Sequence, residues 1–288
     1  MFHAQSDLVA PVYREADLVI GIGYDSIEFN YESWMPKVPL IHLDSEPADI
    51  TPEYDVACEV TGDLAAMLAY INSLTLPAYD WDLDRIKANK DRLFQSLMPR
   101  TASFNPSDLI AVLQQALPKD GIITGDVGAH LHLLGQLWQS EEPNRFIMTN
   151  GWSTMGFGIP AAIGAKLCRP ASTVVGIVGD GGFLMNCGEL LTARRLGINV
   201  VIIVLCDRNL SLIEVKQDWK KVVQYGTDLY EGEYFAAEAF LGVPILKARD
   251  EGEMKQSLLK AFGTTGPVII EAVVDGSVYK NLITRSYK

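Results

Sequence analysis

The chain has 288 residues, of which 48% are hydrophobic, and it carries a formal net charge of −12. This length and composition predict one or two domains with packed cores and argue against a disordered chain. Nucleic acids and anionic membrane surfaces require a cationic face, so the negative charge argues against both as partners. An anionic ligand would have to be held locally, by a metal ion, backbone N–H groups or single basic side chains.

The cysteines and the hydropathy pattern indicate the compartment. Neither a CxxC motif nor a Cys/His cluster is formed by Cys58, Cys168, Cys187 and Cys206. This pattern favours buried thiols in a reducing compartment over zinc ligands or disulfides. No apolar run reaches transmembrane length, and the first residues lack the basic start and apolar middle of a signal peptide. We therefore expect a cytoplasmic protein with no membrane partner.

Residues 1–75 contain short β-branched runs at 18–23 and 38–43, followed by a predicted helix at 64–74. Such alternation predicts part of a parallel sheet. The first run ends in glycines but lacks the third glycine of a dinucleotide fingerprint, so an NAD site has little support. These few strands are too few for a doubly wound sheet, so we expect half of a domain here.

Residues 76–105 are predicted to be a linker with a charged amphipathic surface helix at 81–98. Residues 106–288 alternate helical and strand patterns, which predicts an α/β fold with a parallel sheet. A helix capped by Ser107-Asp108 is expected to end near residue 117. The other predicted helices are 161–167, 186–196, 213–221, 234–240 and 251–262. The predicted strands are 121–124, 174–178, 200–205, 243–247 and 268–274.

Polar residues follow two of these strands where each strand ends. Gly179-Asp180-Gly181-Gly182 follows the run 174–178, and Asp207-Arg208-Asn209 follows the run 200–205. Open α/β sheets bind ligands at the carboxyl ends of their strands, so these segments are expected to meet there. Glycine N–H groups and two carboxylates suit a divalent cation that bridges a diphosphate. Alternatively, the glycines form a simple turn and Asp207 caps a helix.

These segments resemble the diphosphate and metal motif of thiamine diphosphate (ThDP) enzymes. Many members end that motif in Asn-Asn, whereas Cys206-Asp207 here is similar to the catabolic acetolactate synthases. The segment TMGFGIPAAIGA, residues 154–165, resembles a second signature of the same enzymes. IGYDSIEFNYESW near the start and TTGPVIIEAVVD near the end also resemble acetolactate synthases. The resemblance implies the C-terminal half of a Rossmann-like central domain at 1–75 and a diphosphate-binding domain at 106–288.

The resemblance implies ThDP and Mg²⁺ as cofactors, with no FAD. It assigns the metal to Asp180, Asp207 and the backbone carbonyl of Asn209. Met155 would wedge between the two rings of the cofactor, although core filling is the alternative. His130 would reach the diphosphate, although a partly buried structural histidine is the alternative, and the latter is favoured for His132. The full set implied for the cofactor is Gly128, Ala129, His130, Met155, Gly179, Asp180, Gly181, Gly182, Asn209 and Leu212.

The same resemblance places the second substrate at the start of the helix that follows the motif, beside Ile213, Lys216 and Gln217. Lys216 either holds a substrate carboxylate or faces solvent, as most helical lysines do. The glutamate that relays protons in this family belongs to a pyrimidine-binding domain, and no segment here resembles that domain. The catalytic residue is therefore unknown, and we expect a truncated or split chain that forms a homo-oligomer or pairs with a pyrimidine-binding domain.

The resemblance implies a carboligase that converts two pyruvates, or related 2-keto acids, to 2-acetolactate and CO₂. Two alternatives remain open. The chain is a non-catalytic fragment or partner subunit, or it carries another ThDP reaction, such as glyoxylate carboligation, 2-keto acid decarboxylation or acyl transfer. All of these reactions share the quoted motifs, and a fold alone does not decide between them.

Overall fold

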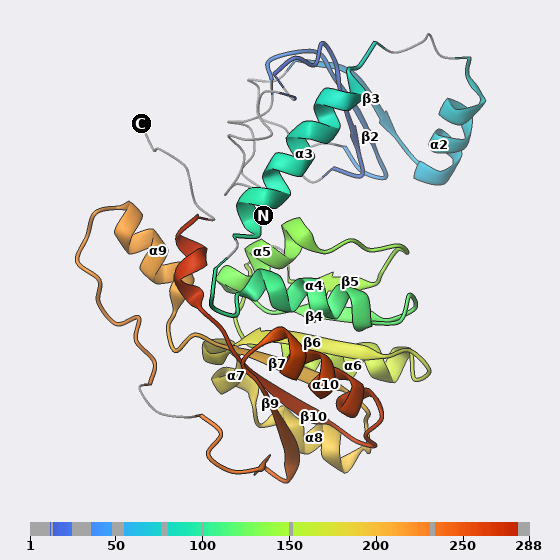
Figure 1. Ribbon diagram of the computed structural model, residues 1–288. Coiled ribbons are helices and arrows are strands. Elements are labelled where there is room, and N and C mark those ends of the chain that lie inside the picture. The colour runs from blue at the N-terminus through green and yellow to red at the C-terminus, as the bar shows by residue number, and fades with distance from the viewer. Residues whose placement is uncertain are drawn as a thin grey trace. The chain divides into compact units, whose positions relative to one another are not determined.

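A computed structural model describes residues 12, 14–24, 36–47, 55–75, 80–99, 101–149, 152–230 and 234–281. The chain divides into two compact units, essentially His3–Leu93 and Phe94–Thr284. The described residues of each unit contain one main sheet, of three strands in the first and seven in the second (Figure 1). Most of the segment IGYDSIEFNYESW, and Asn150-Gly151 before the second signature, lie outside the described residues.

The first unit contains a small parallel sheet with the strand order β1-β2-β3. Its strands are β1 (Val19–Ile22), β2 (Leu40–Asp44) and β3 (Val56–Thr61). Helix α2 (Leu64–Ser73) starts after Asp63, whose carboxylate accepts the Ala66 N–H at 2.7 Å. An N-cap of this kind satisfies a helix N–H group that would otherwise lack a partner. Helix α3 (Leu83–Leu97), the predicted surface helix, spans the boundary between the units.

The second unit confirms the predicted α/β fold with a parallel sheet. Its strand order is β5-β4-β6-β7-β10-β9-β8, and every pairing is parallel except that of β8 with β9. Its strands are β4 (Ile122–Gly125), β5 (Phe146–Met148), β6 (Val174–Gly179), β7 (Val201–Cys206), β8 (Ala239–Phe240), β9 (Val243–Ala248) and β10 (Val268–Val273). The central strands β6 and β7 are buried over almost their whole length, as expected when helices cover both faces.

Helices pack on both faces of this sheet (Figure 1). They are α4 (Pro106–Ala116), α5 (Ala129–Leu137), α6 (Gly158–Cys168), α7 (Asp180–Asn186), α8 (Glu189–Arg195), α9 (Ser211–Trp219), α10 (Glu251–Phe262) and the 3₁₀ helix η2 (Gly276–Asn281). Alternate β6 side chains, including Val174 and Val178, join α6 and α8 in one core cluster. On the other face, α4 and α10 pack against each other. No helix in the described parts of the chain is long and apolar enough to cross a membrane.

Several predicted helices have other bounds in the structure, among them the predicted helix 213–221, which forms two residues earlier as α9. The predicted helix 186–196 is replaced by α7 and α8, and α7 begins at Asp180, so the glycines after β6 are already helical. Helix α4 begins about two residues earlier than predicted, with Asn105 as the cap and Asp108 accepting its N–H at 2.9 Å. This reciprocal arrangement is a capping box, and Pro106 occupies a first-turn position where its missing N–H costs nothing.

The predicted helix 234–240 was also wrong, because this segment is irregular and ends in β8. Tertiary packing overrides helix propensity here. The rings of Phe235 and Phe240 lie 5.3 and 5.6 Å from the Phe183 ring of α7, which draws the segment across the sheet. A two-residue turn, Leu241-Gly242, then joins β8 to β9, and both of its residues have positive φ.

Candidate functional site

A cavity of about 250 Å³ lies at the carboxyl ends of β4, β6 and β7. Gly179 at the end of β6 pairs with Leu205 of β7, so the segments that follow the two strands begin side by side. Every residue predicted for the cofactor, the metal or the substrate lines this cavity, with the exception of Gln217. The Gln217 amide instead holds the backbone of Tyr225, which it contacts at 3.0 and 3.1 Å.

Asp180 is the first residue of α7 and only 3% of it is exposed. Its carboxylate accepts the N–H of Gly181 and the N–H of Arg208, each at 2.8 Å. Arg208 has a positive φ of 65°, a left-handed conformation that few non-glycine residues adopt. Burial, together with the negative charge of Asp207, raises the pKa of Asp180 to about 7. The ionised form is therefore costly unless a cation lies beside it.

Asp207 follows β7 and is the second carboxylate of the cavity. It accepts hydrogen bonds from the Ser211 hydroxyl and, at 3.3 Å, from the Asn209 N–H. Burial raises the pKa of Asp207 above its ordinary value. On its far side lies Gly276 of η2, where a Cβ would overlap the carboxylate. A side chain at position 276 would thus push Asp207 out of place.

The donor set fits a hard divalent cation. The Asn209 side-chain oxygen is buried without a hydrogen-bond partner, while its amide nitrogen donates to Glu214. A buried oxygen without a hydrogen-bond partner, close to a buried and a half-buried carboxylate, is costly unless a cation or a hydrogen-bond donor lies against it. The described residues contain no cluster of three or more His, Cys, Asp or Glu side chains suited to a metal. A cation here would need carbonyl, amide, water or phosphate oxygens as further ligands, as Mg²⁺ commonly does.

His130 forms another part of the cavity wall. It is buried, and its Nε2 has no hydrogen-bond partner. Burial, and then the neighbouring His132, lower the pKa of His130 to about 4, so the ring is neutral at physiological pH. The ring lies against Gly179, where a Cβ would stand 3.2 Å from its Cε1, and more closely against Gly128. The two glycines therefore make room for an imidazole that has a free nitrogen for a ligand.

Met155 lies in the loop before α6 and is half-buried rather than fully buried. Its Cε lies 3.1 Å from the position that a Cβ on Gly181 would occupy. The thioether thus covers the first turn of α7 and lines the cavity. This placement favours a role in ligand contact over core filling. Gly182 has a different reason to be glycine, because a Cβ there would overlap the carboxylate of Asp126.

Sequence reasoning did not single out the remaining lining residues, which are Val127, Ser153, Leu205, Leu210, Ser211 and Tyr279. Ser211 could have been found as a hydroxyl one helical turn beyond Asp207. Tyr279 gave no signal, because it reaches the cavity only through the position of η2. Its hydroxyl is buried, and burial raises its pKa above the ordinary value.

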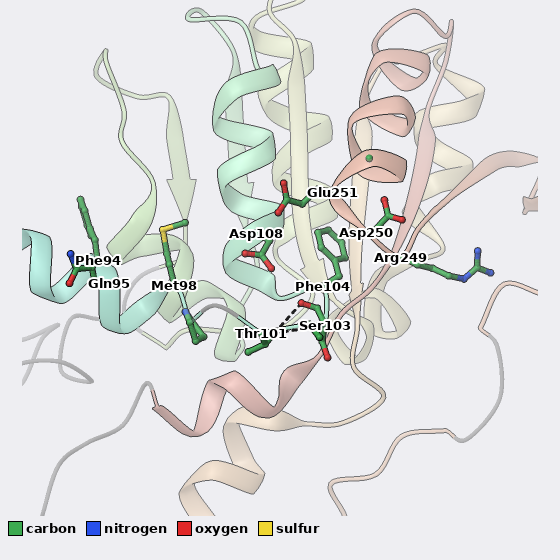
Figure 2. Close-up of a pocket in the computed structure, with 13 residues that line it drawn as sticks. Phe94, Gln95, Met98, Thr101, Ser103, Phe104, Asp108, Arg249, Asp250 and Glu251 are labelled. Carbon is green, nitrogen blue, oxygen red and sulfur yellow. Dashed lines mark hydrogen bonds between the residues drawn. The ribbon is translucent and has the colours of Figure 1, made fainter.

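A larger cavity of about 900 Å³ lies elsewhere in the second unit, beside the first turns of α4 and α10 (Figure 2). Its lining includes Asp108, Asp250 and Glu251. Asp108 accepts the N–H of the cap residue Asn105 at 2.9 Å, and Asp250 caps α10 by accepting the Glu253 N–H at 2.8 Å, so both carboxylates already serve helix starts. None of the residues predicted for ligand binding lies there. We therefore assign the functional site to the smaller cavity.

Comparison with known proteins agrees with this site. Residues 126–272 match the C-terminal TPP binding domain of thiamine pyrophosphate enzymes. The chain is 30% identical over 268 residues to the acetolactate synthase isozyme 2 large subunit of Escherichia coli (strain K12), covering 91% of this chain and 48% of that protein. It is 29% identical over 292 residues to the acetolactate synthase of Bacillus subtilis (strain 168), covering 93% and 49%.

A third relative is the catabolic acetolactate synthase of Raoultella terrigena. It is 30% identical over 276 residues, covering 91% of this chain and 48% of that protein. The chain thus spans about half the length of these relatives. The match to the binding domain begins just after β4, and it includes β6, β7 and every lining residue of the cavity except Tyr279.

Proposed function

Because the chain belongs to the thiamine pyrophosphate enzyme family, we propose that it is an acetolactate synthase-like carboligase that uses ThDP and Mg²⁺ to convert two pyruvates to 2-acetolactate and CO₂. The observation that carries the proposal is the pairing of the buried carboxylate of Asp180 with the half-buried carboxylate of Asp207, together with the buried Asn209 side-chain oxygen that has no hydrogen-bond partner. This set suits Mg²⁺ bound to a diphosphate better than any uncharged ligand.

In this proposal, Asp180, Asp207 and Asn209 hold Mg²⁺, with the Asn209 backbone carbonyl and its side-chain oxygen as alternative donors. His130 directs its free Nε2 at the diphosphate, and Gly128, Gly179 and Gly181 leave room for it. Met155, which lines the cavity next to Gly181, would contact the bound cofactor. When bound, ThDP supplies a nucleophilic carbon for addition to a keto group, and the protein contributes binding, orientation and electrostatics.

The substrate end of the cavity carries a cation. Lys216 is the only Lys or Arg among the described residues that line the cavity. The neighbouring acids of α9, Glu214 and Asp218, face Lys280 of η2 at 3.6 and 3.7 Å. Within the described part of the chain, Lys216 itself has no carboxylate within 4 Å. We assign it, with Ile213, to the carboxylate and methyl groups of a 2-keto acid.

The proposal also requires a pyrimidine-binding domain, in a homo-oligomer or in a complex, to provide the family's proton-relaying glutamate. Isothermal titration of the chain with ThDP and Mg²⁺ tests the cofactor site directly. Heat that requires both components is expected, and no heat at millimolar ligand would count against the proposal. Asp218→Asn, in α9 but not among the residues that line the cavity, is the control for Asp180→Ala, which should abolish the heat.

Acetolactate formation from pyruvate, with and without an added pyrimidine-binding domain, tests the reaction. Turnover that appears only with the added domain supports the carboligase. Full cofactor binding without turnover on pyruvate would support the non-catalytic alternative. Turnover on glyoxylate, or aldehyde release from a 2-keto acid, would instead identify another ThDP reaction.

A further inference from the structure

Asp126 lies just outside the cavity, yet it contacts three of the segments that build it. It is fully buried at the end of β4, where its N–H donates to the Ile177 carbonyl of β6 at 2.9 Å. This ladder bond fixes its backbone. Burial raises the pKa of its carboxyl, and the carboxylate accepts hydrogen bonds from backbone N–H groups. A buried carboxylate whose hydrogen bonds come from backbone N–H groups is suited to holding a loop of the site in place.

The carboxylate of Asp126 holds the loop that carries Met155. One oxygen accepts the Gly156 N–H at 3.1 Å, and the other accepts the Gly158 N–H at 3.2 Å. From the opposite side, the Asn186 amide of α7 donates to the Gly156 carbonyl at 2.7 Å. Gly156 has a positive φ of 87°, and a Cβ there would stand 2.7 Å from the Asn186 nitrogen. Gly156, the residue after Met155, is therefore held through its N–H by Asp126 and through its carbonyl by Asn186.

Asp126 also reaches the other two walls of the cavity. The His130 ring forms a hydrogen bond with the Asp126 backbone. In α7, a Cβ on Gly182 would overlap its carboxylate. One residue thus ties the imidazole, the thioether loop and the first turn of α7 into one unit. Loops that touch a ligand are usually mobile, so fixing this one in advance lowers the entropy lost on binding.

We propose that Asp126 and Asn186 are positioning residues that clamp Gly156 and so hold Met155 over Gly181 before the cofactor binds. The inference rests on the proposed function for the identity of the ligand, while the clamp itself can be tested without it. Neither residue touches the ligand in this proposal, and both act through Met155.

Hydrogen exchange of the ligand-free chain tests the clamp. Asn186→Ala and Asp126→Asn should each accelerate exchange of the Gly156 and Gly158 amides about tenfold or more, as expected for loss of one hydrogen bond to a buried group. Asn199→Ala is the matched control, because Asn199 accepts the Gly266 N–H at 2.6 Å in a turn away from the cavity. Unchanged exchange at Gly156 in both variants would overturn the clamp.

A double-mutant cycle with Met155→Ala tests whether the clamp acts through the thioether. With ThDP and Mg²⁺ as the titrated ligand, Asn186→Ala should weaken binding about tenfold in the wild-type background and less than threefold in the Met155→Ala background. Equal losses in the two backgrounds would refute positioning. If the wild-type chain does not bind ThDP and Mg²⁺, the proposed function is refuted but the clamp is not. The hydrogen-exchange result would still show whether Asp126 and Asn186 hold Gly156. Asn186→Ala keeps the test open if Asp126 variants fail to fold.

Discussion

Replacing Asp180 by Asn should stabilise the ligand-free protein while abolishing cofactor binding. Burial and the Asp207 charge raise the pKa of Asp180 from 3.8 to about 7. Each unit corresponds to about 1.4 kcal/mol, so ionisation of Asp180 costs the folded state about 4 kcal/mol above pH 7. Asn removes this cost. It also turns an NH₂ group toward one of the two N–H donors, Gly181 or Arg208, which costs about 1–3 kcal/mol.

The net gain expected for Asp180→Asn is about 1–3 kcal/mol at pH 8. The size of this gain depends on pH. A carboxyl whose pKa is raised in the folded state makes the free energy of unfolding of the protein fall as pH rises. The free energy of unfolding of the wild type should fall between the unfolded pKa of 3.8 and the folded value of about 7, and level off above it. Near pH 5 the wild type has lost only about 1–2 kcal/mol, so the advantage of the variant should disappear.

Urea unfolding with a chelator present, monitored by circular dichroism at pH 5 and pH 8, measures the free energies of unfolding of the wild type and of Asp180→Asn. The exposed Asp120, in the turn before β4, is the site of the control variant Asp120→Asn. Added Mg²⁺ and ThDP should raise the unfolding free energy of the wild type but not of Asp180→Asn. A variant that is no more stable than wild type at pH 8, or equally shifted at both pH values, would refute the account of Asp180.

Three further substitutions test other parts of the structure. Leu241→Asn should stabilise the second unit by about 0.5–1 kcal/mol in urea unfolding, because Leu241 holds a φ of 52° in a two-residue hairpin turn that favours Asn-Gly. Gly276→Ala should weaken the binding of ThDP and Mg²⁺ about tenfold or more, as measured by calorimetry, because the added Cβ overlaps Asp207. An unchanged affinity would show that η2 shifts to make room for the Cβ. Lys216→Gln, in the assembly that turns over, should raise KM for pyruvate about tenfold with little change in ThDP affinity. An unchanged KM would mean that Lys216 faces solvent.

The local pattern of the chain was enough to predict the parts that depend on neighbouring residues. The Val- and Ile-rich runs of β6 and β7 can only be buried strands, and parallel pairing then brings Asp180 and Asp207 to one sheet edge. That is why most of the predicted site residues line one cavity. The predicted α/β class follows from the same periodicity, whereas the resemblance to thiamine diphosphate enzymes depends on the motif residues at the strand ends.

Tertiary contacts between distant residues decided the rest. The contact between Phe183 and Phe235 overrides a helical pattern at 234–240. Tyr279 reaches the cavity only because η2 packs against Asp207, and no local signal marks it. Gly182 is glycine because Asp126, distant in sequence, occupies the space where its side chain would lie. Periodicity reports which face of an element is buried, whereas only the folded chain determines which side chain lies against it.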